Sequence, residues 1–185
     1  MALMHTPICN FGWKPPAIAL LGVDGRSYDL DAIRGPNGTL LMFICNHCPY
    51  VKAVVSRLVI DVKAMQGEGI GVAAIMPNDT ELIEADSFEH MKVFSKTHGF
   101  TFPYLLDETQ ETARAYNAVC TPDFFGFNSD DELQYRGRLD ECGLKPPTDS
   151  TRRELLEAMR SIIKTGQGPD DQEASIGCSI KWRAV

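Results

Sequence analysis

The chain has 185 residues, of which 44% are hydrophobic and 23% are charged, a balance typical of one globular domain with a full core. Its net charge of −7 argues against a surface for nucleic acid or an anionic membrane, since both need clusters of Lys and Arg. No apolar run reaches the roughly 18 residues of a membrane span. The first residues lack the cationic and apolar regions of a secretory signal, so we expect a cytoplasmic protein.

The first part of the chain predicts a hairpin, a buried strand and a long helix. Residues 17–22 and 26–30 are short strand-like runs joined by Asp24–Gly25, a dipeptide that favours a tight hairpin turn. The continuous apolar run at 39–44 is typical of a strand buried on both faces of a sheet. Valine, leucine and methionine then recur with a helical period over 49–66, which predicts an amphipathic helix.

The middle of the chain continues the alternation of strands and helices. Residues 70–76 and 101–106 are predicted strands, and 87–97 is a predicted helix. The segment Asp107-Glu-Thr-Gln110 fits a capping box for a short helix that extends to Tyr116.

The last third predicts one more hairpin and one more helix. The hairpin joins residues 123–128 to 132–138, and Thr151-x-x-Glu154 fits a capping box that opens a helix ended by Gly166.

We find no internal repeat and no linker long enough to divide the chain. One domain is therefore expected over residues 1–185, with 166–185 as a C-terminal tail. The order of the predicted elements indicates an α/β sandwich with a mixed sheet.

The six cysteines direct attention to thiol chemistry. Without an export signal three structural disulfides are not expected, and only Cys45 and Cys48 are closely spaced, as a C-x-x-C pair. The pair lies where the buried strand ends and the long helix begins, and a helix N-terminus stabilises a thiolate. We expect Cys45 to receive this field most directly and to be the nucleophile, with Cys48 more buried and resolving. His47 between them either lowers the pKa of Cys45 or faces solvent.

Metal ligation is an alternative use of the same pair. A c-type haem site needs histidine after the second cysteine, where this chain has Pro49. A zinc ribbon needs a second C-x-x-C or a close histidine pair, and the sequence has neither. Thiolates at Cys45 and Cys48, with His47 or Cys178 as a further ligand, would suit copper(I) or zinc in a metal-binding or delivery module.

Several motifs together carry a resemblance to a known family. They are Gly22–Gly25, Phe43–Pro49, Leu106–Glu111, Val119–Pro122 and Tyr135–Asp140. On these motifs the sequence resembles the thioredoxin-fold, peroxiredoxin-like (AhpC/TSA, redoxin) family over most of its length. More narrowly, it is similar to uncharacterised peroxiredoxin-like proteins that bear Cys-Asn-His-Cys-Pro-Tyr and a terminal Gly-Cys-Ser-Ile-Lys-Trp.

The resemblance implies a fold and one further site residue. The fold is a thioredoxin-like three-layer sandwich, with a mixed central sheet flanked by helices and an N-terminal β-hairpin extension. Pro122 matches the cis-proline that faces the C-x-x-C and leaves the backbone before it free to pair with an extended substrate. Cys120 would then lie near Cys45, although a small buried hydrophobe is the favoured interpretation of this residue.

Two features depart from the patterns that the resemblance implies. Thioredoxins hold a buried acid on the strand before the pair, but 39–44 contains none, so His47 or water must accept the proton. The peroxidatic motif P-x-x-x-[TS]-x-x-C is absent before both Cys45 and Cys48. Arg138 is either a source of positive charge for the site or an ordinary exposed arginine.

The sequence favours a thiol–disulfide oxidoreductase that uses Cys45 and Cys48. A thiol peroxidase with an antioxidant role, using the same two cysteines, is the alternative within redox chemistry. The expected partners are a protein bearing a disulfide or dithiol, or a peroxide, together with a thiol reductant; no cofactor is expected. In the tail, Ile180 and Trp182 are expected to pin the chain to its own domain or to the partner of a homodimer, whereas Cys178 is a candidate third redox thiol.

Overall fold

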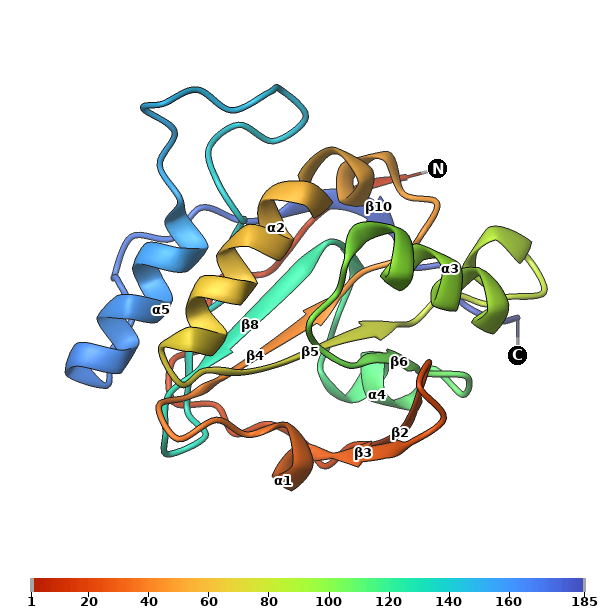
Figure 1. Ribbon diagram of the computed structural model, residues 1–185, viewed down its shortest axis with the longest axis horizontal. Coiled ribbons are helices and arrows are strands. Elements are labelled where there is room, and N and C mark those ends of the chain that lie inside the picture. The colour runs from red at the N-terminus through yellow and green to blue at the C-terminus, as the bar shows by residue number, and fades with distance from the viewer. Residues whose placement is uncertain (1, 185) are drawn as a thin grey trace.

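The computed structural model describes residues 2–184, so Met1 and Val185, the ends of the predicted domain, lie outside the described residues. A seven-stranded sheet with the order β3-β2-β6-β5-β4-β8-β9 forms the centre (Figure 1). Its strands β4 (Thr39–Phe43), β5 (Gly71–Met76) and β6 (Tyr104–Leu106) are parallel to one another, and the other pairings are antiparallel. The predicted mixed sheet of an α/β fold is confirmed.

The remaining strands of this sheet form two antiparallel hairpins at its edges, and helices occupy the connections. The strands are β2 (Ala19–Gly22), β3 (Ser27–Asp29), β8 (Asp123–Phe127) and β9 (Leu133–Tyr135). The helices are α1 (Leu30–Ile33), α2 (Pro49–Gly67), η1 (Glu84–Asp86), α3 (Phe88–His98), α4 (Glu111–Ala115) and α5 (Glu154–Thr165).

Strand β4 is buried on both faces, as its unbroken apolar sequence predicts. Leu40 and Met42 belong to the core shared with α2, α3 and α5, whereas Leu41 and Phe43 belong to the core on the opposite face. All four side chains are fully buried. Burial of a side chain of this size stabilises the fold by about 1.5–3 kcal/mol, so β4 holds the two layers together and fixes the position of the residues that follow it.

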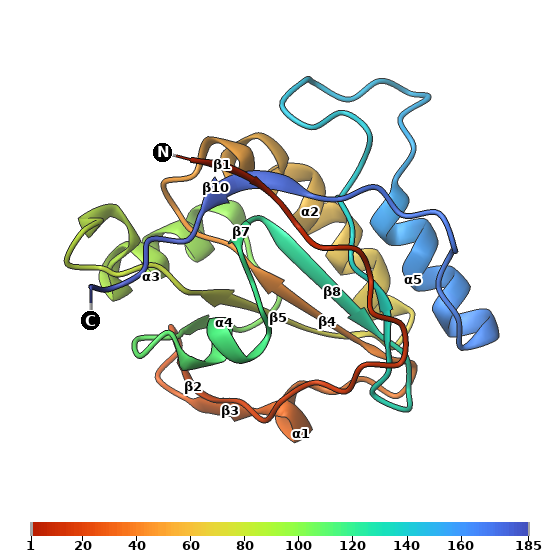
Figure 2. The ribbon, with the colours of Figure 1, turned by 180° about the vertical axis from the view of Figure 1, so that it is seen from behind.

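The two faces of the sheet are covered differently. Helices α2, α3 and α5 lie together on one face (Figure 1), and α4 lies on the other face (Figure 2), where its Ala113 belongs to the core. The three layers match the predicted sandwich. Within residues 2–184, the structure has no helix long and apolar enough to cross a membrane.

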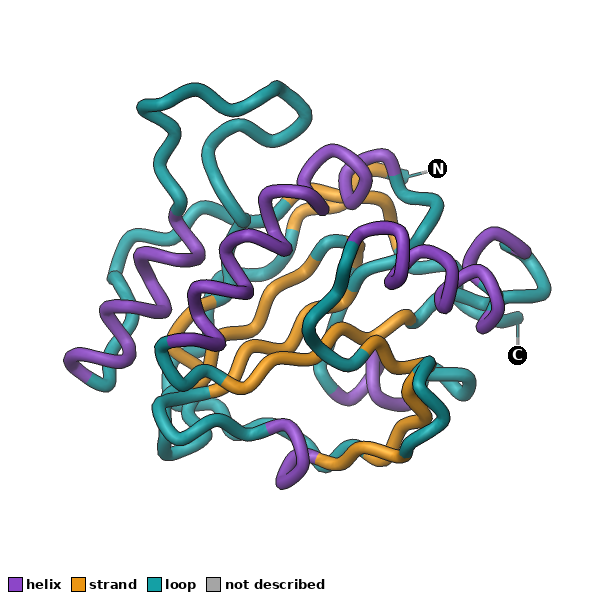
Figure 3. The backbone as a smooth tube through the Cα atoms, viewed as in Figure 1, coloured by secondary structure: helices purple, strands orange, loops and turns teal. Residues whose placement is uncertain are grey.

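A second, three-stranded sheet joins the two ends of the chain and was not predicted. Its order is β1-β10-β7, with β1 (Leu3–His5), β10 (Ile176–Ser179) and β7 (Cys120–Thr121), and all its pairings are antiparallel. The predicted C-terminal tail, 166–185, therefore contains a strand, β10, and loops make up most of the remaining tail (Figure 3). Ile180 is buried and Trp182 packs against the core, so the predicted pinning of the tail to its own domain is confirmed.

Both predicted capping boxes are wrong. The carboxylate of Asp107 accepts from the backbone N–H groups of Thr112 and Ala113, beyond the reach of a capping box, and α4 has Gln110 as its N-cap. Helix α5 begins at Glu154 itself, and this carboxylate binds a side chain elsewhere. At Glu154 a tertiary ion pair takes the acid that the local pattern assigned to a helix end, whereas Asp107 still binds the first turn of α4 although it lies outside the helix.

Candidate active site

The C-x-x-C pair lies in the connection between β4 and α2. Cys48 is the N-cap of α2 and Pro49 occupies its first turn, where a missing N–H costs nothing. Cys45 lies three residues earlier, outside the helix. The expectation that Cys45 receives the helix field most directly is therefore wrong, because the free N–H groups of the first turn face Cys48.

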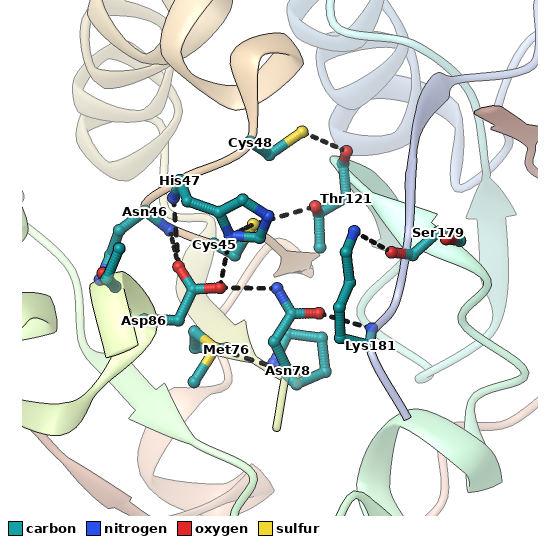
Figure 4. Close-up of polar contacts among 12 residues, drawn as sticks. Cys45, Asn46, His47, Cys48, Met76, Asn78, Asp86, Thr121, Ser179 and Lys181 are labelled. Carbon is teal, nitrogen blue, oxygen red and sulfur yellow. Dashed lines mark hydrogen bonds and ion pairs between the residues drawn. The ribbon is translucent and has the colours of Figure 1, made fainter. Parts of the chain in front are cut away.

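Thr121 faces both sulfur atoms from β7 (Figure 4). Its hydroxyl Oγ1 lies 3.2 Å from Cys45 Sγ, and its carbonyl oxygen lies 3.2 Å from Cys48 Sγ. The Thr121–Pro122 bond is cis, as the match of Pro122 to the family cis-proline implies. Cys45 and Cys48 are equally and completely buried, so the expectation that Cys48 is the more buried of the two is wrong.

The two thiols have opposite electrostatic surroundings. The hydrogen bond with Cys45, helped by the backbone N–H groups of Val51 and Cys178, lowers the pKa of Cys48 to about 4. Burial, the hydrogen bond to Cys48 and the charge of Asp86 raise the pKa of Cys45 well above its ordinary value. The surroundings of the pair thus favour the proton on Cys45 and the thiolate at Cys48.

Both positions of that proton have partners in the structure. With the proton on Cys45, its S–H donates to the Cys48 thiolate. With the proton on Cys48, that S–H donates to the Thr121 carbonyl, and a thiolate at Cys45 accepts from the Thr121 hydroxyl. Thr121 therefore stabilises the second state from both of its oxygen atoms, which lets the thiolate move between the two cysteines.

Asp86 is the main residue that the sequence interpretation missed. It is completely buried at the end of η1, and its Oδ1 accepts from the backbone N–H groups of Asn46 and His47. Its Oδ2 lies 2.6 Å from His47 Nδ1 and accepts from the Asn78 amide at 2.7 Å. Burial raises the pKa of Asp86, but the hydrogen bonds from His47 and Asn78 outweigh it and hold the pKa below its ordinary value.

His47 is turned toward Asp86 more than toward the thiols. Its Nδ1 is 3.6 Å from Cys45 Sγ, a full ångström further than from Asp86 Oδ2. Because Asp86 is ionised, Nδ1 donates to the carboxylate and does not take the proton of Cys45. Within residues 2–184, His47 Nε2 is a buried nitrogen without a hydrogen-bond partner. Of the two alternatives for this side chain, the one in which it faces solvent is wrong, since only 14% of it is exposed.

The remaining candidate residues fall into different places. Cys120 is a buried thiol whose Sγ contacts the Pro122 carbonyl at 3.7 Å, and burial raises its pKa, as suits a small buried hydrophobe. Arg138 forms a two-pronged ion pair with Glu154 and so supplies no free charge to the thiols. All six cysteines lie within residues 2–184 and are free thiols.

One group of side chains has the composition of a metal site. Cys45, His47 and Asp86 each offer a donor atom, and these atoms lie within 4.8 Å of one another. The set differs from the predicted one, because Asp86 takes the place of Cys48. A thiolate, an imidazole and a carboxylate suit zinc, but Asp86 and His47 already bind each other.

The family model described as the AhpC/TSA family matches residues 11–136. The chain belongs to the AhpC/TSA family. No curated protein matches it. An uncharacterized conserved protein from Geobacillus kaustophilus is 39% identical, with 100% of this chain and 98% of that chain covered and a TM-score of 0.94. A hypothetical protein from Sinorhizobium meliloti 1021 is 30% identical, with 98% of both chains covered and a TM-score of 0.89.

A more distant structure shows the fold of this AhpC/TSA protein. The thioredoxin domain of a thiol-disulfide oxidoreductase from Bacteroides vulgatus is 16% identical, with 68% of this chain and 86% of that chain covered and a TM-score of 0.57. The predicted thioredoxin-like fold and the predicted family are thus confirmed. The protein is a thioredoxin-fold redoxin in which Cys45 and Cys48 lie close together.

Proposed function

We propose that this AhpC/TSA protein is a thiol–disulfide oxidoreductase whose redox-active pair is Cys45 and Cys48. The observation that carries the proposal is the pair itself: two buried thiols lie at the N-terminus of α2, and both contact Thr121. The Cys48 thiolate accepts hydrogen bonds from Cys45 and from the backbone N–H of Val51. A thiolate stabilised in this way is the reactive form in disulfide exchange.

The proposed cycle moves two electrons and one proton. One cysteine of the pair attacks a substrate disulfide as the thiolate, and the more distant substrate sulfur leaves as a thiolate that takes a proton. The second cysteine loses the proton that this first sulfur takes and attacks the mixed disulfide, which releases the other substrate sulfur as a thiolate and closes the Cys45–Cys48 disulfide. A thiol reductant then restores the dithiol, and the reverse sequence oxidises a dithiol substrate.

The order of attack stays a prediction, with Cys45 first and Cys48 second. Because the resting proton lies on Cys45, attack by this residue requires the proton to move to Cys48. The contacts of Thr121 with both sulfur atoms support that transfer. The negative charge of Asp86 opposes a thiolate at Cys45 and so limits the population of the attacking state.

Redox titration with glutathione buffers tests the function. After acid quenching and alkylation, mass spectrometry should find a reversible Cys45–Cys48 disulfide in the wild type. Reduction of insulin by the protein and a thiol reductant should be lost in C45S and C48S and kept in C120S, the matched control for a buried thiol. A wild type without the Cys45–Cys48 disulfide would contradict the proposal. The variant C48S should accumulate a glutathione adduct on Cys45, and its absence would refute attack by Cys45.

Peroxidase activity with the same cysteines is the second candidate, and membership of the AhpC/TSA family favours it. Peroxide would oxidise one thiolate to a sulfenic acid, and the other thiol would condense with it, with loss of water, to the same disulfide. Rapid mixing of the reduced, metal-free protein with hydrogen peroxide separates the two functions. Oxidation far faster than that of an ordinary free thiolate would identify a peroxidase, and a rate equal to that control would favour disulfide exchange.

A further inference from the structure

The C-terminal strand β10 lies against the residue that faces the redox pair. In the antiparallel ladder of β10 and β7, Cys178 is opposite Thr121 and Ser179 is opposite Cys120. Figure 2 shows β10 passing across this end of the molecule between β1 and β7. An extended segment of the chain itself thus occupies the sheet edge beside Pro122, where the family resemblance places the backbone of a substrate.

The approach of β10 to this edge is too close for a side chain at residue 177. A Cβ atom placed on Gly177 would lie 2.0 Å from the carbonyl oxygen of Thr121 and 3.1 Å from the nitrogen of Pro122. Glycine at this position therefore lets the backbone lie directly on the Thr121–Pro122 segment. On either side of it, Ser175 donates to the Pro122 carbonyl at 2.7 Å and Lys181 N–H donates to Asn78 at 2.9 Å.

The same register brings a third thiol to the pair. Cys178 lies opposite Thr121, whose carbonyl oxygen is 3.2 Å from Cys48 Sγ, and the backbone N–H and thiol of Cys178 help to lower the pKa of Cys48. Burial and this contact raise the pKa of Cys178 to about 11, so Cys178 is the protonated partner. Cys120 is the nearest comparison in the chain, and its thiol is directed to the Pro122 carbonyl instead.

We propose that Cys178 is a third redox thiol, which takes over the disulfide from the Cys45–Cys48 pair by attack on Cys48. The inference rests on the proposed function of that pair. The sulfur of Cys178 bonds to Cys48 Sγ, the Cys45–Cys48 bond breaks, and the proton of Cys178 passes to the departing Cys45 sulfur. No electron leaves the chain in this step: one disulfide is exchanged for another, Cys48–Cys178, and Cys45 becomes a thiol again.

In this exchange the C-terminal strand β10 acts as a substrate within the same chain. Antiparallel pairing with β7 supplies the backbone alignment that an extended peptide would otherwise have to find. Because Cys178 belongs to the same chain, its effective concentration at Cys48 far exceeds that of an external thiol. The regenerated Cys45 would be free to react with a second disulfide or peroxide while the first oxidation is stored on β10.

The variant C45S isolates the new disulfide. We would equilibrate full-length C45S with oxidised and reduced glutathione, quench with acid, alkylate and map the disulfides by mass spectrometry. The expected product is Cys48–Cys178, formed as Cys48 displaces one glutathione and Cys178 displaces the other. The double variant C45S/C178S should stop at a glutathione adduct, whereas C45S/C120S should give the same product as C45S.

A second variant tests the role of the strand itself. Adding G177A to C45S should push β10 from Thr121 and reduce the yield of Cys48–Cys178, while G67A, at the end of α2 where a Cβ meets nothing within 4 Å, should not. A C45S protein that stays reduced, or that stops at the glutathione adduct, would overturn the inference. The wild type in the same buffers tests the proposed function separately. If it forms the Cys45–Cys48 disulfide, the proposed function stands whatever C45S does. If it forms no such disulfide, the proposed function is wrong.

Discussion

The hydroxyl of Thr121 allows a direct test of how the pair divides its proton. It is 3.2 Å from Cys45 Sγ, whereas the contact with Cys48 is made by the carbonyl oxygen of Thr121. The substitution Thr121→Val removes the hydroxyl and keeps the shape of the side chain and the backbone carbonyl. Since Cys45 and Thr121 are both buried, water cannot replace the lost donor, and only a thiolate at Cys45 is affected.

The size of the effect follows from the energy of one hydrogen bond to a charged group. Such a bond contributes about 1.5–3 kcal/mol to stability. At 1.36 kcal/mol per pH unit, its loss raises the pKa of Cys45 by about one to two pH units. The population of the Cys45 thiolate at neutral pH then falls about 10–100-fold. If Cys45 attacks the substrate, the rate of disulfide exchange falls by the same factor.

Stopped-flow reaction of reduced T121V with oxidised glutathione measures this rate. The matched control is T121S, which keeps the hydroxyl and should react at nearly the wild-type rate. Circular dichroism of both variants would show that the fold is intact. A T121V protein that is folded and reacts as fast as T121S would refute the role of Thr121 and, with it, the proton transfer that lets Cys45 attack.

Five further predictions concern the same protein. In the reduced wild type, ultraviolet thiolate absorbance should rise through about pH 4, and C48S should lose this step. Because the pKa of Cys48 in the folded protein lies below the ordinary 9.0, the Cys48 thiolate stabilises the fold fully above pH 9. This stabilisation declines as the pH falls toward 4. Acid should therefore lower the stability of the reduced form more than that of the oxidised form, which has no thiolate at Cys48. Asp123→Asn leaves the buried charge of Arg136 unpaired and should lower the free energy of unfolding in urea by about 3–5 kcal/mol. Tyr104→Phe removes the donor to Asn46 Oδ1 and should cost about 1–3 kcal/mol in the same assay. Protein treated with a chelator should keep its full disulfide-exchange activity. A stoichiometric metal content by mass spectrometry, together with loss of activity when the metal is removed, would instead support the metal-binding alternative.

Much of the fold follows from sequence because its central elements have strong local patterns. The apolar run at 39–44 and the helical period at 49–66 correspond closely to β4 and α2, which end within two residues of the predicted positions. The Asp24–Gly25 turn likewise gives the β2–β3 hairpin, with Leu20 opposite Tyr28. In each case the residues that define the element are neighbours in the chain, and burial on the sheet reinforces their preference.

The small sheet was missed because its pairing is not local. Strand β7 has two residues and β10 has four, and neither shows the alternation that identifies a strand. Their pairing is a tertiary contact, since Thr121 and Cys178 are opposite each other although they are far apart in the sequence. Gly177 indicates close backbone packing only once the approach of the Thr121–Pro122 backbone is known.

The sequence predicted the two cysteines of the site but not its buried carboxylate. The C-x-x-C spacing identifies the pair, but Asp86 lies 39 residues from His47 in the chain. It follows a strand parallel to β4, so its approach to the same sheet edge was open to prediction. Asp79, Glu81 and Glu84 precede it in the same connection, however, Asp79 is also buried, and no local pattern distinguishes the carboxylate that reaches His47.

The asymmetry between the two thiols links the C-terminal strand to the direction of the redox chemistry. Stabilising the thiolate of the reduced pair makes a disulfide a stronger oxidant. Two of the groups that stabilise it at Cys48, the backbone N–H and the thiol of Cys178, belong to β10. A substrate that displaced β10 would remove both donors, raise the pKa of Cys48 and make the pair a weaker oxidant. Docking of β10 and the oxidising power of the Cys45–Cys48 pair therefore change together. In G177A, the pH at which thiolate absorbance rises should be higher than in the wild type.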